Sequence, residues 1–127
     1  MNNQKNTANT EMLKRYSDAW NEHDIEKIMF YMTEDCIFRT GGGEQSYGTQ
    51  YQGQAEVRER FESIWGQFPD VYFKNTRHFL QGDRGCSEWT FVATGPDGNK
   101  LKIGGCDIFT FREGKIAVKN TFLKNRK

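Results

Sequence analysis

Apolar residues recur at helical spacing in three segments of the first half of the chain. Leu13, Tyr16 and Trp20 form the first stripe, since residues three or four apart share one helix face. Asn9 or Thr10 can cap this helix, and Asp24 can cap a second. The second helix has the apolar face Ile25, Ile28, Met29 and Met32. A third is predicted over residues 54–65, with Val57, Phe61, Ile64 and Trp65 on one side and Gly66 as a natural stop.

The rest of the pattern is typical of strands and turns. Residues 35–39 form a short strand candidate, and residues 40–53 form a long loop of the kind that is usually either a functional lid or disordered. Four further β-rich runs cover residues 71–80, 88–94, 101–111 and 116–123. Gly82-Asp83, Gly-Pro-Asp-Gly-Asn (95–99) and Glu113-Gly114 are the turn signals between them. The order α-α-β-α-β-β-β-β predicts an α+β fold with helices packed on one face of a curved, mostly antiparallel sheet.

Turn positions predict which residues face each other across the last three strands. A turn centred on Asp97-Gly98 places Glu88 opposite Asp107, and a turn centred on Glu113-Gly114 places Asn120 opposite Asp107. The second turn also pairs Phe109 with Val118 and Phe111 with Ile116. One face then carries the apolar residues Phe109, Phe111, Ile116, Val118 and Phe122, with Glu88, Asp107 and Asn120 among them.

Two carboxylates on a mostly apolar face suggest acid/base chemistry. Cross-strand neighbours lie about 5 Å apart, and two close, partly buried carboxylates raise the pKa of one of them. Asp107 and Glu88 are therefore the candidate catalytic pair. A structural alternative remains open, in which Arg77, predicted opposite Glu88, or a Lys from a neighbouring strand neutralises the pair. In this register Lys119 points to the opposite face, although a β-bulge, for example at Gly104-Gly105, would reverse that assignment.

Composition and charge restrict the function classes. The 127 residues predict one domain, with residues 1–9 as a flexible N-terminal extension. The net charge is only +1, and the sequence has no cluster of basic residues beyond the tail at 124–127. Nucleic-acid binding is therefore not expected. Three Cys without a Cys-x-x-Cys and only two His predict no metal site. No apolar run reaches membrane-spanning length and no signal-peptide core is present, so a cytoplasmic protein without membrane association is expected.

Several short motifs together resemble a known superfamily. They are Tyr16-x-x-x-Trp20-Asn21-x-His23-Asp24, Tyr51-x-Gly53, Gly82-Asp83-Arg84, Glu88-Trp89-Thr90 and the run from Gly105 through Asp107 to Ile116. In this order the motifs resemble the nuclear transport factor 2-like superfamily and, within it, the SnoaL-like group related to polyketide cyclases and ketosteroid isomerases. The resemblance implies a cone-shaped domain and, for any catalysis, chemistry without a cofactor. It places Asp107 at the acid/base aspartate of the cyclases. The chain has Ala93-Thr94-Gly95 where those cyclases carry Gly-Thr-His.

The expected function is therefore binding of a small, cyclic or aromatic organic ligand in an apolar pocket. Isomerase-, cyclase- or dehydratase-type proton transfer is the catalytic form of this function, and a non-catalytic dimeric ligand-binding or protein-interaction module is the alternative. The expected ligand contacts are Tyr16, Trp20, Phe38, Arg77, Phe109 and Asn120. The alternative role for Tyr16 and Trp20 is in the core, which is the commoner role of such a stripe. The other sheet face is expected to pair two copies as a homodimer. Its predicted residues are Trp89, Phe91, Ile108, Thr110, Ala117 and Thr121.

Overall fold

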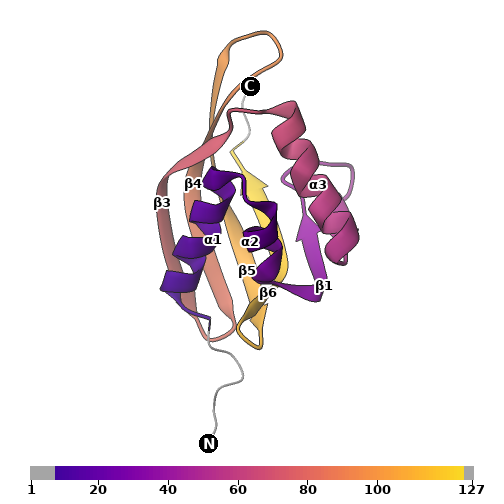
Figure 1. The fold of residues 1–127 in the computed structure, drawn as a ribbon, viewed down its shortest axis with the longest axis vertical. Helices are drawn as coiled ribbons and strands as arrows, with labels where there is room; N and C mark the ends of the chain where they lie inside the picture. Colours follow the sequence, from indigo (N-terminus) through magenta and orange to yellow (C-terminus); the bar gives the residue numbers. More distant parts are fainter. Residues whose placement is uncertain (1–7, 125–127) are drawn as a thin grey trace, which may run out of the picture.

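Three helices cover one face of a curled, open six-stranded sheet in the computed structural model, which describes residues 8–124 (Figure 1). The elements are α1 (Thr10–Glu22), α2 (Ile25–Phe30), β1 (Met32–Arg39), β2 (Gln50–Gln52), α3 (Gln54–Gln67), β3 (Tyr72–Gln81), β4 (Arg84–Thr94), β5 (Lys100–Arg112) and β6 (Lys115–Leu123). The predicted α+β class and element order are confirmed, and the short β2 is an addition within the expected loop. Most of the predicted N-terminal extension lies outside the described residues.

Side-chain caps begin the first two helices as the sequence predicts. The Asn9 carboxamide oxygen accepts a hydrogen bond from the Met12 amide at 2.9 Å, and the Asp24 carboxylate accepts one from the Lys27 amide at 3.2 Å. These bonds satisfy backbone donors that have no partner within a helix. Both caps confirm the predicted starts, whereas α3 continues past Gly66 to Gln67.

The core lies between the helices and the concave face of the sheet. Tyr16 on α1 meets Phe109 on β5 edge to face at 5.9 Å between ring centroids, and Trp20 meets Phe61 on α3 at 4.8 Å. All four side chains are at least 95% buried. Each buried side chain of this size stabilises the fold by roughly 2–3 kcal/mol. This aromatic layer holds α1 and α3 over the sheet.

The strand order in the sheet is β2-β1-β6-β5-β4-β3, and only the β1–β6 pair is parallel. The hairpin between β4 and β5 is centred on Asp97, because Thr94 pairs with Lys100 across a loop of five residues. Asp107 therefore lies opposite Ser87, and Glu88 lies opposite Cys106. The predicted pairing of Glu88 with Asp107 is wrong by one residue, which moves Glu88 to the convex face, away from Asp107. The predicted pairing of Arg77 with Glu88 is confirmed.

A second correction comes from a β-bulge at Ala117. Phe111 pairs with Ile116 as predicted, but Thr110 pairs with Val118, so Ala117 is an extra residue in β6. The bulge reverses the direction of every later side chain in this strand. Phe109 consequently pairs with Lys119, and Asp107 pairs with Thr121 rather than with Asn120.

These two shifts change the residues on each face of the sheet. Trp89, Phe91 and Thr121 lie on the concave face and line a cavity together with Asp107, so their predicted place on the outer face is wrong. Ile108 and Thr110, at positions alternate to Asp107 and Phe109, lie on the convex face as predicted. The convex face still carries apolar side chains, which we call the outer apolar patch: Phe79, Cys86, Ile108, Val118 and Phe122.

Candidate functional site

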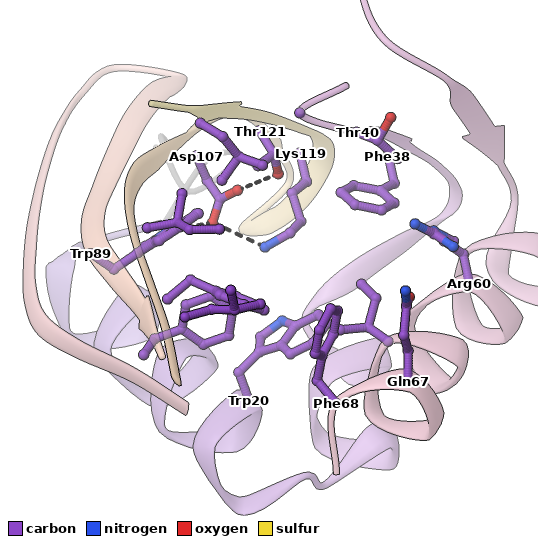
Figure 2. A pocket seen from close by; sticks show the side chains of 17 residues that line it. Trp20, Phe38, Thr40, Arg60, Gln67, Phe68, Trp89, Asp107, Lys119 and Thr121 are labelled. Atoms are coloured by element: carbon purple, nitrogen blue, oxygen red, sulfur yellow. Dashed lines mark hydrogen bonds and ion pairs between the residues drawn. The ribbon is translucent and has the colours of Figure 1, made fainter. Parts of the chain in front are cut away.

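A cavity of about 270 Å³ lies between the concave face and the helices (Figure 2). Its wall is mostly aromatic and aliphatic, with a few polar side chains grouped at two places. Asp107, Lys119 and Thr121 come from β5 and β6, and Arg60 and Gln67 come from α3. The apolar lining is Trp20, Phe38, Ile64, Phe68, Phe73, Trp89, Phe91, Leu101, Ile103 and Leu123. Small-molecule sites commonly combine such a wall with a few placed polar groups.

A buried ion pair joins the last two strands at this wall. Lys119 Nζ donates to Asp107 Oδ2 at 3.0 Å, and the two side chains are only 8% and 6% exposed. The Trp89 indole N–H donates to the same carboxylate oxygen at 2.9 Å, and the Thr121 hydroxyl donates to Asp107 Oδ1 at 2.6 Å. A buried charge is costly unless it is paired and hydrogen bonded. Both Asp107 oxygens meet this requirement.

Aromatic rings surround the Lys119 ammonium. Its nitrogen lies 5.1 Å from the ring centroid of Tyr16 and 5.2 Å from that of Trp20, with Phe109 at 5.6 Å and Phe61 at 5.9 Å. A cation near aromatic rings is attracted by their π-electron density. Burial acts to lower the pKa of Lys119, but the Asp107 carboxylate and Tyr16 raise it by more. Lys119 is therefore a fixed ammonium ion in an apolar surrounding.

Strand register and one glycine bring Lys119, Asp107 and the aromatic side chains around them side by side. Phe38, Lys119 and Phe109 form one cross-strand row on β1, β6 and β5. Trp89 lies opposite Gly105, and a Cβ atom at residue 105 would come within 2.8 Å of the Trp89 ring. Because Gly105 has no side chain, the Trp89 indole can lie over the strand with its N–H on Asp107.

The arrangement can stabilise negative charge on a bound molecule. An ammonium has three N–H donors, and Asp107 accepts one from Lys119. Lys119 itself lines the cavity, where low polarity strengthens a hydrogen bond from its ammonium to an oxygen atom. Asp107 accepts from three side chains. These three hydrogen bonds hold the Asp107 carboxylate in place, and the carboxylate in turn orients Lys119.

The residues predicted for the site are only partly brought together. Trp20 and Phe38 line the cavity with Asp107. Tyr16 and Phe109 do not line this cavity and instead border a small void of about 20 Å³ beside Lys119. The remaining three predicted residues lie apart from the cavity. Exposed Glu88 and Arg77 line a groove on the convex face, and Asn120 borders a depression under the loop at 40–48.

Lys119, Trp89 and Thr121 are site residues that the sequence analysis assigned to the wrong face. Lys119 carried a signal of its own, since a Lys that follows the apolar run Ile116-Ala117-Val118 in a predicted strand needs an acidic partner where it is buried. Among residues 8–124, no group of three His, Cys, Asp or Glu side chains could hold a metal ion. Within the same residues, no helix has the length and apolar character to cross a membrane.

Comparison with known proteins identifies a family for this chain and solved structures with the same fold. The model of the SnoaL-like domain matches residues 13–119. A Xanthomonas campestris protein of unknown function with a cystatin-like fold superposes with a TM-score of 0.81 at 19% identity, covering 94% of this chain and 92% of that chain. A proposed polyketide cyclase from Xanthomonas campestris pv. campestris superposes with a TM-score of 0.80 at 17% identity, covering 91% of this chain and 89% of that chain. TerC, co-crystallised with polyporic acid, superposes with a TM-score of 0.77 at 21% identity, covering 91% of this chain and 90% of that chain. No curated protein matches the sequence.

Proposed function

Because this chain belongs to the SnoaL-like domain family, we propose that it binds a small, cyclic or aromatic organic molecule in the cavity between the helices and the sheet. The aromatic wall favours a flat, apolar ligand body. The co-crystallisation of TerC with polyporic acid supports a small-molecule ligand for a chain of this fold.

One observation carries this proposal, namely the buried Lys119–Asp107 ion pair at the cavity wall. A buried ion pair seldom stabilises a fold better than apolar side chains of the same volume would. We infer that its place on an aromatic wall serves the recognition of a ligand. The complementary group is an oxygen atom, such as a ketone, that accepts a hydrogen bond from Lys119.

A neutral aromatic ketone tests the proposal. Trp20 and Trp89 line the cavity, so 2-acetylnaphthalene should quench the tryptophan fluorescence in a saturable way. Lys119→Met should weaken this binding about tenfold, a change typical of one lost charge-assisted hydrogen bond. Lys115→Met is the matched control, because Lys115 lies over Phe30 away from the cavity. Absence of saturable quenching, or equal binding by Lys119→Met, would contradict the proposal.

The same geometry supports proton transfer without a cofactor as a second candidate. Loss of a proton from the carbon beside a ketone creates an enolate oxygen, whose charge Lys119 would stabilise. Asp107 would accept that proton in exchange for one of its present hydrogen bonds. Glu88 lies on the convex face, so the proposal assigns it no part in this step. Deuterium incorporation into 2-tetralone, followed by NMR in D₂O, should be faster with the native chain than with Asp107→Asn.

We also propose that the chain forms a homodimer through the outer apolar patch. Phe79 and Phe122 are 65% and 52% exposed, although large aromatic side chains are usually buried. A symmetric dimer would cover the same patch on both copies. The cavity lies on the opposite face of the sheet, so pairing would leave it accessible.

A further inference from the structure

The free hydrogen-bonding groups around the cavity are mainly donors. The Asp107 oxygens accept from Trp89, Lys119 and Thr121, and the Thr121 hydroxyl is used in this network. The Thr40 hydroxyl donates to the Gly42 carbonyl at 2.6 Å. Lys119 and Arg60 are the two cations of the lining, whereas Asp107 is its one carboxylate. The lining therefore has a net charge of +1.

Arg60 is the second cation of the lining. Its Nε atom is buried without a hydrogen-bond partner, and within residues 8–124 Arg60 forms no ion pair. The guanidinium lies 5.7 Å from the Tyr51 ring centroid and donates to Ser63 Oγ at 3.3 Å. Arg60 and Gln67 lie on the α3 side of the cavity, across from Lys119 (Figure 2). A buried donor without an acceptor costs free energy, which a ligand acceptor would recover.

We propose that Arg60 is a second anchoring residue, so that the ligand is a flat organic anion with an oxygen-bearing group at each end. This inference rests on the proposed function and deepens it. One oxygen accepts from Lys119 on the sheet side, and a carboxylate or ionised hydroxyl pairs with Arg60 on the α3 side. Guanidinium groups suit such oxyanions because their donors form a planar fork. A neutral ligand of the same shape leaves Arg60 unpaired, so the site discriminates by charge.

The test compares 6-hydroxy-2-naphthoate with its neutral amide, 6-hydroxy-2-naphthamide, by isothermal titration calorimetry on the full chain. The two probes share shape and ring system and differ in charge at one end. The native chain should bind the acid at least about tenfold more tightly than the amide, the gain expected from one charge-assisted pair. Arg60→Gln should reduce this preference to about threefold or less and leave the affinity for the amide nearly unchanged.

Arg58→Gln is the matched control on the same helix. Arg58 pairs with Glu26 and Glu62 and does not line the cavity, so the preference for the acid should persist. Melting temperatures verify that each variant is folded. Equal binding of acid and amide by the native chain would overturn the role of Arg60 and leave the proposed function standing. An equal loss of preference in Arg58→Gln would also overturn that role. Failure of both probes to bind would overturn both proposals.

Discussion

The ammonium of Lys119 lies 3.0 Å from the carboxylate of Asp107, and both side chains are more than nine-tenths buried. The two residues are on neighbouring strands and are brought to the same face by the bulge at Ala117. Each neutralises a charge that would otherwise be costly in the interior. The pair therefore has two effects: it holds β5 and β6 together, and it places two charged groups at the wall of the cavity.

Asp107→Asn should strand the Lys119 ammonium. Removing one partner of a buried ion pair costs about 3 to 5 kcal/mol, which lowers the melting temperature by roughly 10 °C or more for a domain of this size. Thermal melts followed by circular dichroism measure the change. Asp35→Asn is the control, because Asp35 pairs with Arg112 at the surface and should leave the melting temperature nearly unchanged. An unchanged melting temperature for Asp107→Asn would contradict the prediction that the ion pair stabilises the fold.

Replacing both partners should be less harmful than the sum of the two single changes. The double variant Asp107→Asn/Lys119→Met removes both charges, so neither remains buried alone. We expect a coupling energy of roughly 1–3 kcal/mol in a double-mutant cycle. Urea titrations of the four proteins give the four free energies of unfolding. Strictly additive losses would mean that the two side chains do not stabilise each other.

Gly105→Ala should displace the Trp89 indole. The new Cβ atom would meet the Phe122 carbonyl oxygen at 2.5 Å and the Trp89 ring at 2.8 Å, and backbone atoms cannot yield easily. We expect destabilisation of roughly 1–3 kcal/mol from overpacking and an altered near-ultraviolet circular dichroism signal from Trp89. Gly104→Ala is the matched control, because its nearest neighbour would be the flexible Lys124 side chain at 3.6 Å. Similar effects at both positions would contradict the steric explanation.

Asp70 should contribute to acid sensitivity. The Thr94 hydroxyl and amide donate to its carboxylate at 2.5 and 3.0 Å, and these hydrogen bonds lower the pKa of Asp70 from 3.8 to about 2. A carboxylate with a lowered pKa stabilises the fold above its unfolded pKa and loses that contribution as the pH falls through the folded pKa. Native stability should therefore fall between about pH 4 and pH 2. Asp70→Asn should show a shallower fall in urea titrations, and equal slopes would contradict this role.

The outer apolar patch should pair two copies of the chain. Size exclusion with light scattering should give about twice the chain mass of 14.8 kDa. Phe79→Glu should shift the mass towards one chain, because a buried unpaired charge opposes association. Phe30→Glu is the control, since Phe30 is 64% exposed on α2, close to the 65% of Phe79. A native mass of one chain at all concentrations would contradict the dimer.

Much of the fold was predictable from local sequence signals. The caps Asn9 and Asp24, the stripe that includes Trp20, and the turn at Glu113-Gly114 depend on residues near one another in the chain. Local signals of this kind are available without knowledge of packing. They were sufficient for the element order and for the resemblance to SnoaL-like proteins. Of the residues expected at the site, Trp20, Phe38 and Asp107 line the cavity.

The tertiary structure decided which side chains face that cavity. Ile116 and Val118 are both apolar, so the hydrophobic pattern of β6 does not distinguish a regular strand from one bulged at Ala117. The five residues of the loop at 95–99 likewise permit more than one turn centre. Side chains alternate with a period of two, so one extra residue moves Lys119 inward, and a shift of one residue moves Glu88 outward. Those choices depend on contacts between distant segments, above all the contacts of Asp107 with Trp89 and Lys119.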